Sequence, residues 1–153
     1  MNLEELIKLV KRVSKELAEE EELNPLLFTL RDGKLSLAPL PLTEASKDNF
    51  KPTLTKTLRV FGVDSYIIVN EAWQASLTPN SQYTPLLEQG KLKVSEIPLD
   101  DKEEIICLTA VENGKSFTLY SAKIRTYPDK RIIDDWKESL STEITGRLVL
   151  KEW

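Results

Sequence analysis

The chain has 153 residues, a mass of 17.5 kDa and a formal net charge of −4, with 41% hydrophobic and 30% charged residues. This size and composition are typical of a single globular domain spanning residues 1–153. The sequence contains no histidine, which excludes Ser-His-Asp and Cys-His triads and every histidine-ligated metal or haem centre. The single cysteine, Cys107, excludes an intrachain disulfide and a cysteine zinc ribbon.

Residues 2–20 are predicted to form a helix. Asn2 is placed to cap its start, with Glu5 completing a capping-box arrangement. An apolar stripe recurs at helical spacing along it: Leu3, Leu6, Ile7, Val10, Val13 and Leu17. The stripe can cover the chain's own sheet or form a coiled-coil seam with a second chain. Because it is shorter than three or four heptads, the first interpretation is favoured.

A hairpin is predicted next, with strands 26–30 and 34–38 flanking the turn residues Arg31-Asp32-Gly33. Pro39 and Pro41 cannot donate to a ladder, so the chain is expected to leave the sheet there. A second helix is predicted over 47–62 and should end at Gly62.

A long strand is predicted at 65–77, followed by a polar loop at 78–90 and a short strand at 91–95. A second hairpin pairs 103–112 with 115–126 around Asn113-Gly114, the signature of a two-residue type I′ turn. That register places Glu112 opposite Lys115 and Glu104 opposite Lys123.

The same register sorts the apolar residues of this hairpin onto two faces. One face would carry Ile105, Cys107, Val111, Tyr120 and Ile124, and the other Ile106, Leu108, Ala110, Phe117 and Leu119. Because both faces are apolar, we expect the hairpin to be central and covered on both sides.

The last part of the chain is predicted to hold a short helix over Ile132, Ile133, Trp136 and Leu140, capped by Asp129, and then a strand over 144–150. Tight hairpins dominate the predicted order of elements. The fold class is therefore expected to be α+β, a largely antiparallel sheet of five to six strands with two main helices packed on it.

Glu71 is the most unusual residue of the long strand, because alternation places its carboxylate on the more apolar face beside Ile67, Val69, Trp73 and Ala75. The favoured interpretation is an ion pair or hydrogen bond with a cation such as Arg125 or Arg147, or an exposed strand end. The functional alternative is a carboxylate with a raised pKa that serves acid–base chemistry.

Cys107 lies mid-strand between Ile106 and Leu108, so its thiol is expected to be buried and inert. The sequence has neither a GxxxxGK[ST] phosphate loop nor a GxGxxG fingerprint. We therefore expect no cofactor and no metal ion.

Residues 31–60 form the most basic part of the chain, where six cations against three acids give a net charge of +3. The cations are Arg31, Lys34, Lys47, Lys51, Lys56 and Arg59. A solvated surface is the favoured interpretation, and we do not expect this acidic chain to bind nucleic acid. The acidic start at Glu4 and Glu5 and the lack of a ~20-residue apolar stretch predict a cytoplasmic protein without membrane contact.

Four short motifs lie in the second half: Glu71-Ala72-Trp73, the segment 98–104 leading into an apolar strand, Ile124-Arg125, and Gly146-Arg147-Leu148-Val149. Their order resembles a group of small phage, plasmid and prokaryotic proteins with E-A-W, P-x-x-D/R-E-E, I-x-R and G-R-apolar segments. The resemblance covers about residues 66–150, with Lys102 where that group often has Arg. The resemblance implies a shared fold and a mobile-element origin, and it does not assign any activity to the chain.

A non-catalytic binding protein, an adaptor or accessory domain, is the function that these observations favour. The excess apolar surface predicts a homodimer that buries Trp or Leu residues of the sheet face or of the first helix. The alternatives are a carboxylate-dependent enzyme using Glu71 with Glu103 or Glu104, and a nucleic-acid accessory protein using the basic 31–60 region. The candidate interaction or site residues are Glu71, Trp73, Glu103, Glu104, Arg125 and Arg147.

Overall fold

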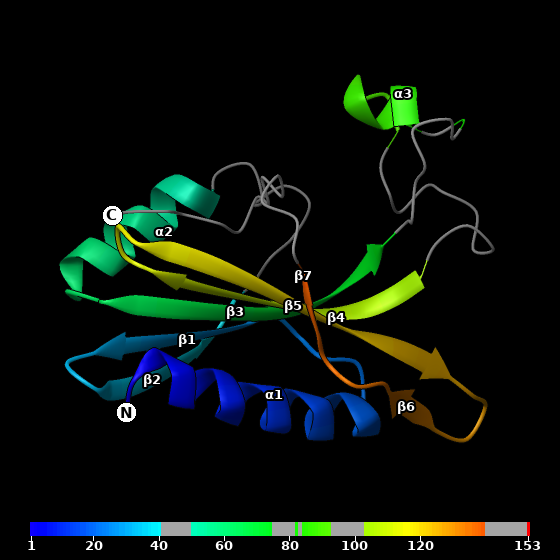
Figure 1. The fold of residues 1–153 in the computed structure, drawn as a ribbon, viewed down its shortest axis with the longest axis horizontal. Helices are drawn as coiled ribbons and strands as arrows, with labels where there is room; N and C mark the ends of the chain where they lie inside the picture. The colour runs from blue at the N-terminus through cyan, green and yellow to red at the C-terminus, as the bar shows by residue number, and fades with distance from the viewer. Residues whose placement is uncertain (41–49, 75–81, 83, 93–102, 140–152) are drawn as a thin grey trace.

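The computed structural model describes residues 1–40, 50–74, 82, 84–92, 103–139 and 153. Its elements are α1 (Leu3–Glu20), β1 (Leu26–Arg31), β2 (Lys34–Pro39), α2 (Phe50–Val60), β3 (Ser65–Gln74), α3 (Thr84–Glu88), β4 (Glu103–Glu112), β5 (Ser116–Thr126), β6 (Arg131–Ile133) and β7 (Lys137–Ser139). The strands form one antiparallel sheet in the order β2-β1-β3-β4-β5-β6, with β7 also paired to β5. The predicted α+β class, helices on a largely antiparallel sheet, is confirmed (Figure 1).

Helix α1 begins where the sequence predicts, because the Asn2 side chain accepts a hydrogen bond from the Glu5 N–H at 2.8 Å. Its buried row differs from the predicted stripe: Leu6, Val10, Ser14 and Ala18 are buried, whereas Leu17 is exposed. These four residues follow one another at i+4, and the last two of them, Ser14 and Ala18, have small side chains.

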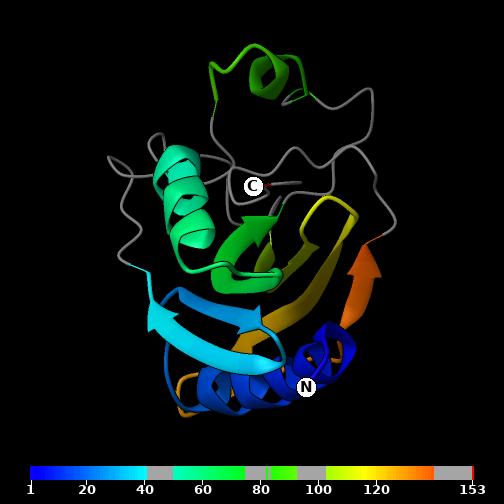
Figure 2. The same ribbon diagram turned by 90° about the vertical axis from the view of Figure 1, so that its left-hand side faces the viewer.

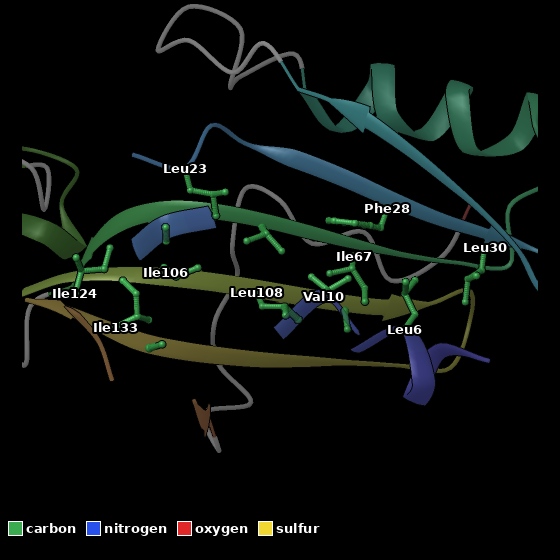
Figure 3. Packing of buried hydrophobic residues seen from close by; sticks show 14 residues of the cluster. Leu6, Val10, Leu23, Phe28, Leu30, Ile67, Ile106, Leu108, Ile124 and Ile133 are labelled. Atoms are coloured by element: carbon green, nitrogen blue, oxygen red, sulfur yellow. The ribbon is translucent and has the colours of Figure 1, made fainter. Parts of the chain in front are cut away.

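The sheet has a hydrophobic core on each face. Helix α1 covers one face and α2 covers the other, as the two ribbon views show (Figures 1 and 2). Figure 3 shows the α1 side, where Leu6 and Val10 of the helix meet Ile67 and Leu108 of the central strands. The α2 side brings together Leu27, Leu54, Leu58, Val63, Tyr66, Ile68 and Val111.

Strands β3 and β4 lie in the middle of the sheet and are buried on both faces. Residues 66–69 of β3 are fully buried although their side chains alternate between the two cores. The two helices of one chain therefore cover both faces of β4, as the sequence predicts for this strand of the hairpin. The homodimer stays a prediction, and any apolar surface it buries lies outside these two cores.

The β1–β2 hairpin turns at Asp32-Gly33 as predicted, but its loop has two residues rather than three, because Arg31 belongs to β1. Arg31 pairs with Lys34, and the turn residues Asp32 and Gly33 both have positive φ angles of 49° and 78°. Positive φ at both central positions defines a type I′ turn, whose twist matches that of the strands.

The predicted register of the β4–β5 hairpin is wrong by one residue. Glu112 pairs with Ser116 rather than Lys115, and Ile105 rather than Glu104 pairs with Lys123. The turn is closed by the Lys115 N–H, which donates to the Glu112 carbonyl at 3.1 Å. Of the two central residues of this turn, only Gly114 has a positive φ, of 72°. A type II turn requires a positive φ at the second central residue, whereas a type I′ turn requires it at both.

This shift exchanges the two faces of β5 relative to β4, because side chains alternate with a period of two. Tyr120 and Ile124 lie on the α1 face with Ile106 and Leu108, whereas Phe117 packs with Val111 against the α2 core. The predicted Glu112–Lys115 ion pair is present at 3.1 Å, but it joins residues within the turn.

Three further predictions differ from the structure. The predicted loop 78–90 contains a short helix, α3. The helix predicted around residues 132–140 is replaced by β6 and β7, because residues 131–133 and 137–139 both pair with β5. Lys91 and Leu92 fold back on Leu86 rather than start a strand. The rest of the strand predicted at 91–95, the strand end at 75–77 and the strand predicted at 144–150 lie outside the described residues.

Candidate functional site

Glu71 lies on the α1 face of β3, opposite Ile106 of β4. Its Oε1 accepts from Arg131 Nη2 at 2.8 Å in an ion pair, and from the Leu23 N–H at 2.8 Å. The side chains of Glu71 and Arg131 are only 7% and 16% exposed. A carboxylate on the apolar face is therefore tolerated because a cation and a backbone donor meet it there.

Arg131, the first residue of β6, also binds the end of α1. Its Nη1 donates to the Ala18 carbonyl at 2.9 Å and to the Glu21 carbonyl at 2.6 Å. Carbonyls at a helix C-terminus lack partners within the helix and carry its negative dipole end, so a guanidinium suits them. We call Glu71, Arg131 and the three backbone groups they bind the Glu71 cluster; it ties β3, β6 and the end of α1 together.

The favoured interpretation of Glu71 as an ion-paired residue is correct, but the predicted cations are not its partner in the described structure. Arg125 pairs with Asp134, with Nη2 and Oδ2 3.1 Å apart, and both side chains are partly exposed. Arg147 lies outside the described residues. Glu71 Oε2 is buried and has no hydrogen-bond partner among the residues described.

The other two candidate carboxylates point to opposite faces of the sheet. Glu104 lies opposite Trp73 of β3 and shares the face of Glu71, whereas Glu103 lies opposite Gln74 and faces the other side. The Glu103 carboxylate lies 3.9 Å from the Lys123 ammonium. Trp73 is 38% exposed at the end of the sheet. Of the two predicted acidic pairs, the sheet register thus brings only Glu71 and Glu104 onto one face.

A second polar contact was not anticipated from the sequence. The Lys11 ammonium lies 3.7 Å from the centroid of the Tyr120 ring, and Trp136 Nε1 donates to the Lys11 carbonyl at 3.1 Å. Burial lowers the pKa of Lys11 and raises the pKa of Tyr120, and the Glu138 charge raises both. The predicted register had placed Tyr120 on the face away from Ile106, which concealed this contact.

The basic residues of the 31–60 region lie on two elements. Lys51, Lys56 and Arg59 are exposed on α2, and Arg31 and Lys34 flank the β1–β2 turn. The Arg31 side chain lies against Gly62, so the turn and the end of α2 are neighbours. Two acidic residues belong to the same part of the molecule, and the Asp32 N–H donates to Asp64 Oδ2 at 2.8 Å. Lys47 lies outside the described residues.

Strand β2 is an edge strand whose six residues are all exposed, and within the described part of the chain it pairs only with β1 (Figure 2). Leu35 and Leu37 lie opposite Leu30 and Phe28 and therefore share the α1 face. Their exposed fractions are 40% and 58%, because α1 packs mainly over β3, β4 and β6.

The backbone of β2 presents alternate residues outward. Arg31 and Lys34 flank a two-residue turn, and such a flanking pair exchanges both of its backbone hydrogen bonds. From Lys34 onward, every second residue of β2 therefore directs its N–H and C=O toward β1, and the residues between them direct these groups away from it. The Leu40 N–H continues this inward series by donating to the Pro25 carbonyl at 2.9 Å. Leu35 and Leu37 consequently direct both N–H and C=O away from β1. We call this outward backbone, with its two leucine side chains, the β2 edge.

Comparisons with protein-family models, with curated proteins and with solved structures found no match to this chain. No described helix is long and apolar enough to cross a membrane. Within the same described residues, no three acidic or cysteine side chains converge as a metal site would require.

Proposed function

We propose that this chain is a non-catalytic cytoplasmic adaptor or accessory protein, of mobile-element origin in keeping with the motif resemblance, that binds a protein partner through the β2 edge. The observation that carries the proposal is the combination of exposed leucines and outward backbone groups on one sheet edge. Natural sheets usually blunt such an edge, because unpaired strand groups attract other strands.

Strand addition is the recognition mode that this edge supports. An extended partner segment would pair with the N–H and C=O of Leu35 and Leu37 and extend the sheet beyond β2. Because side chains alternate along a strand, alternate residues of the partner would lie beside the two leucines on the α1 face. The partner is therefore expected to be a segment with alternating apolar residues and no proline at its paired positions.

A displayed library of random extended peptides, selected on the purified protein, tests this function. The key variant is Leu37→Pro, which removes one outward N–H and leaves the β1–β2 bonds intact, since proline is tolerated on the outer side of an edge strand. Leu37→Thr is the matched control, because it keeps the N–H and the β-propensity but removes apolar surface.

Selected peptides should show the alternating pattern, bind the wild type, lose binding to Leu37→Pro and bind Leu37→Thr more weakly. Urea unfolding of both variants establishes that they are folded. Peptides that bind Leu37→Pro as well as the wild type would contradict the proposal. So would a selection without enrichment on protein diluted until light scattering shows a monomer, where the β2 edge is open to the peptides.

A further inference from the structure

We propose that the occupant of the β2 edge is a second copy of this chain, paired antiparallel with the first about a two-fold axis at Ser36. This inference rests on the proposed function, because it uses the same edge and names its partner. The two sheets would continue into one another through their β2 strands.

Hydrogen-bond geometry selects the register. In an antiparallel pair, residues that direct their backbone at each other exchange two bonds. Placing Leu35 of each copy opposite Leu37 of the other pairs every outward N–H and C=O of both residues. A register shifted by one pair, with the axis at Leu37, would set Leu35 opposite Pro39, which has no N–H to give.

The residues at the two ends of β2 fit the register centred on Ser36 and disfavour a register shifted toward the turn. Lys34 would lie opposite Ala38 of the other copy, so the two lysines are kept apart rather than facing each other. In the opposite direction, a shift toward the turn would require the Gly33 carbonyl, which already accepts from the N-terminal ammonium at 3.4 Å. Self-complementarity about one residue is what an isologous two-fold interface requires.

The side chains are complementary as well. Leu35 and Leu37 of the two copies would form one four-leucine stripe on the α1 face. That stripe would run between the two α1 helices, which pack mainly over β3, β4 and β6 of their own chains. The pairing would thus bury the apolar surface that α1 leaves exposed on β2.

The first test is the mass in solution. Light scattering of the wild type at 100 and 1 µM should give a concentration-dependent mass that approaches twice 17.5 kDa. Leu37→Pro should be monomeric. Leu37→Ser should raise the dissociation constant of the dimer about tenfold or more, because the dimer contains two copies of residue 37 and the substitution removes a buried leucine side chain from each. Phe61→Ser, which removes a 61% exposed side chain elsewhere, should leave the dimer unchanged.

The second test fixes the register by disulfide crosslinking in a Cys107→Ala background. Residues at a non-hydrogen-bonded antiparallel position have Cα atoms about 4.5 Å apart, within the range that a disulfide spans. Ser36→Cys should therefore crosslink on the axis. Ala38→Cys is the control, because its two copies would lie about 13 Å apart, four residues along the strand, and should not crosslink.

A monomeric wild type at 100 µM would overturn this inference, and so would crosslinking of Ala38→Cys or Leu37→Cys in preference to Ser36→Cys. The peptide selection decides the proposed function separately. Peptides that bind the β2 edge of a monomer would leave that function standing with a different partner, whereas a dimer insensitive to Leu37→Pro would show that association uses another surface.

Discussion

Removing the guanidinium of the Glu71 cluster should destabilise the protein strongly. In Arg131→Met, the Glu71 carboxylate loses its cation and keeps one donor, the Leu23 N–H. The carbonyls of Ala18 and Glu21 lose the same partner. Because Glu71 is only 7% exposed, water replaces the lost interactions poorly.

The magnitude follows from the burial of the pair. Removing one partner of a buried ion pair typically costs about 3–5 kcal/mol. Arg131 is 16% exposed, so some water can reach the site and we expect a value near the lower end, about 3 kcal/mol. For a chain of this length, that corresponds to a fall in Tm of roughly 6–12 °C.

Urea unfolding followed by circular dichroism measures this loss as a lower midpoint with an unchanged slope. Arg125→Met is the matched control: its pair with Asp134 has side chains that are 54% and 31% exposed, and such pairs contribute about 0–1 kcal/mol. A double variant, Glu71→Met with Arg131→Met, should lose at least about 1 kcal/mol less than the sum of the two single variants, because it leaves no buried charge unpaired.

Two results would refute this reasoning. One is an Arg131→Met variant that unfolds within about 0.5 kcal/mol of wild type, the usual range for surface substitutions. The other is additivity in the double variant, which would mean that the pair is not coupled and that Arg131 acts only on the end of α1.

Two other side chains have pKa values that give direct tests. The sequence predicts that Cys107 is buried, but it is half-buried. Partial burial raises the pKa of its thiol more than the hydrogen bond with Thr109 lowers it, so iodoacetamide at pH 8 should label the folded protein at least about tenfold more slowly than the unfolded chain. Rapid stoichiometric labelling of the folded protein would show that this partial burial does not protect the thiol. Burial, with the charges of Glu138 and Glu4, raises the pKa of Tyr120, so the unfolded chain ionises first and wild type should lose stability relative to Tyr120→Phe as the pH rises above about 10. A stability difference between these two proteins that stays constant across that range would show that Tyr120 ionises equally in both states.

Local patterns of the sequence were sufficient where neighbouring residues alone determine the structure. Asn2 caps α1 through the Glu5 N–H three residues away, and Asp32-Gly33 adopts the two positive φ angles of its turn. The antiparallel pairing within each hairpin follows from its turn residues, and the placement of Glu71 on an apolar face follows from alternation along its own strand. Each of these features depends on interactions within a few residues, which a sequence pattern records directly.

Long-range contacts decided the rest. Asn113-Gly114 carries the same turn signature, but the Asn113 N–H donates to the Asp64 carbonyl at 3.0 Å and its side chain bonds both the N–H and the carbonyl of Trp153. Asn113 keeps a negative φ, and the register shifts by one residue. The cation that meets Glu71 likewise came from Arg131, sixty residues away, because residues 131–133 extend beside β5 instead of forming a helix. A pattern of neighbouring residues does not indicate which distant residue will be the partner. At the Asn113-Gly114 turn and at residues 131–133, contacts within the folded sheet selected one of two local conformations that the sequence permits.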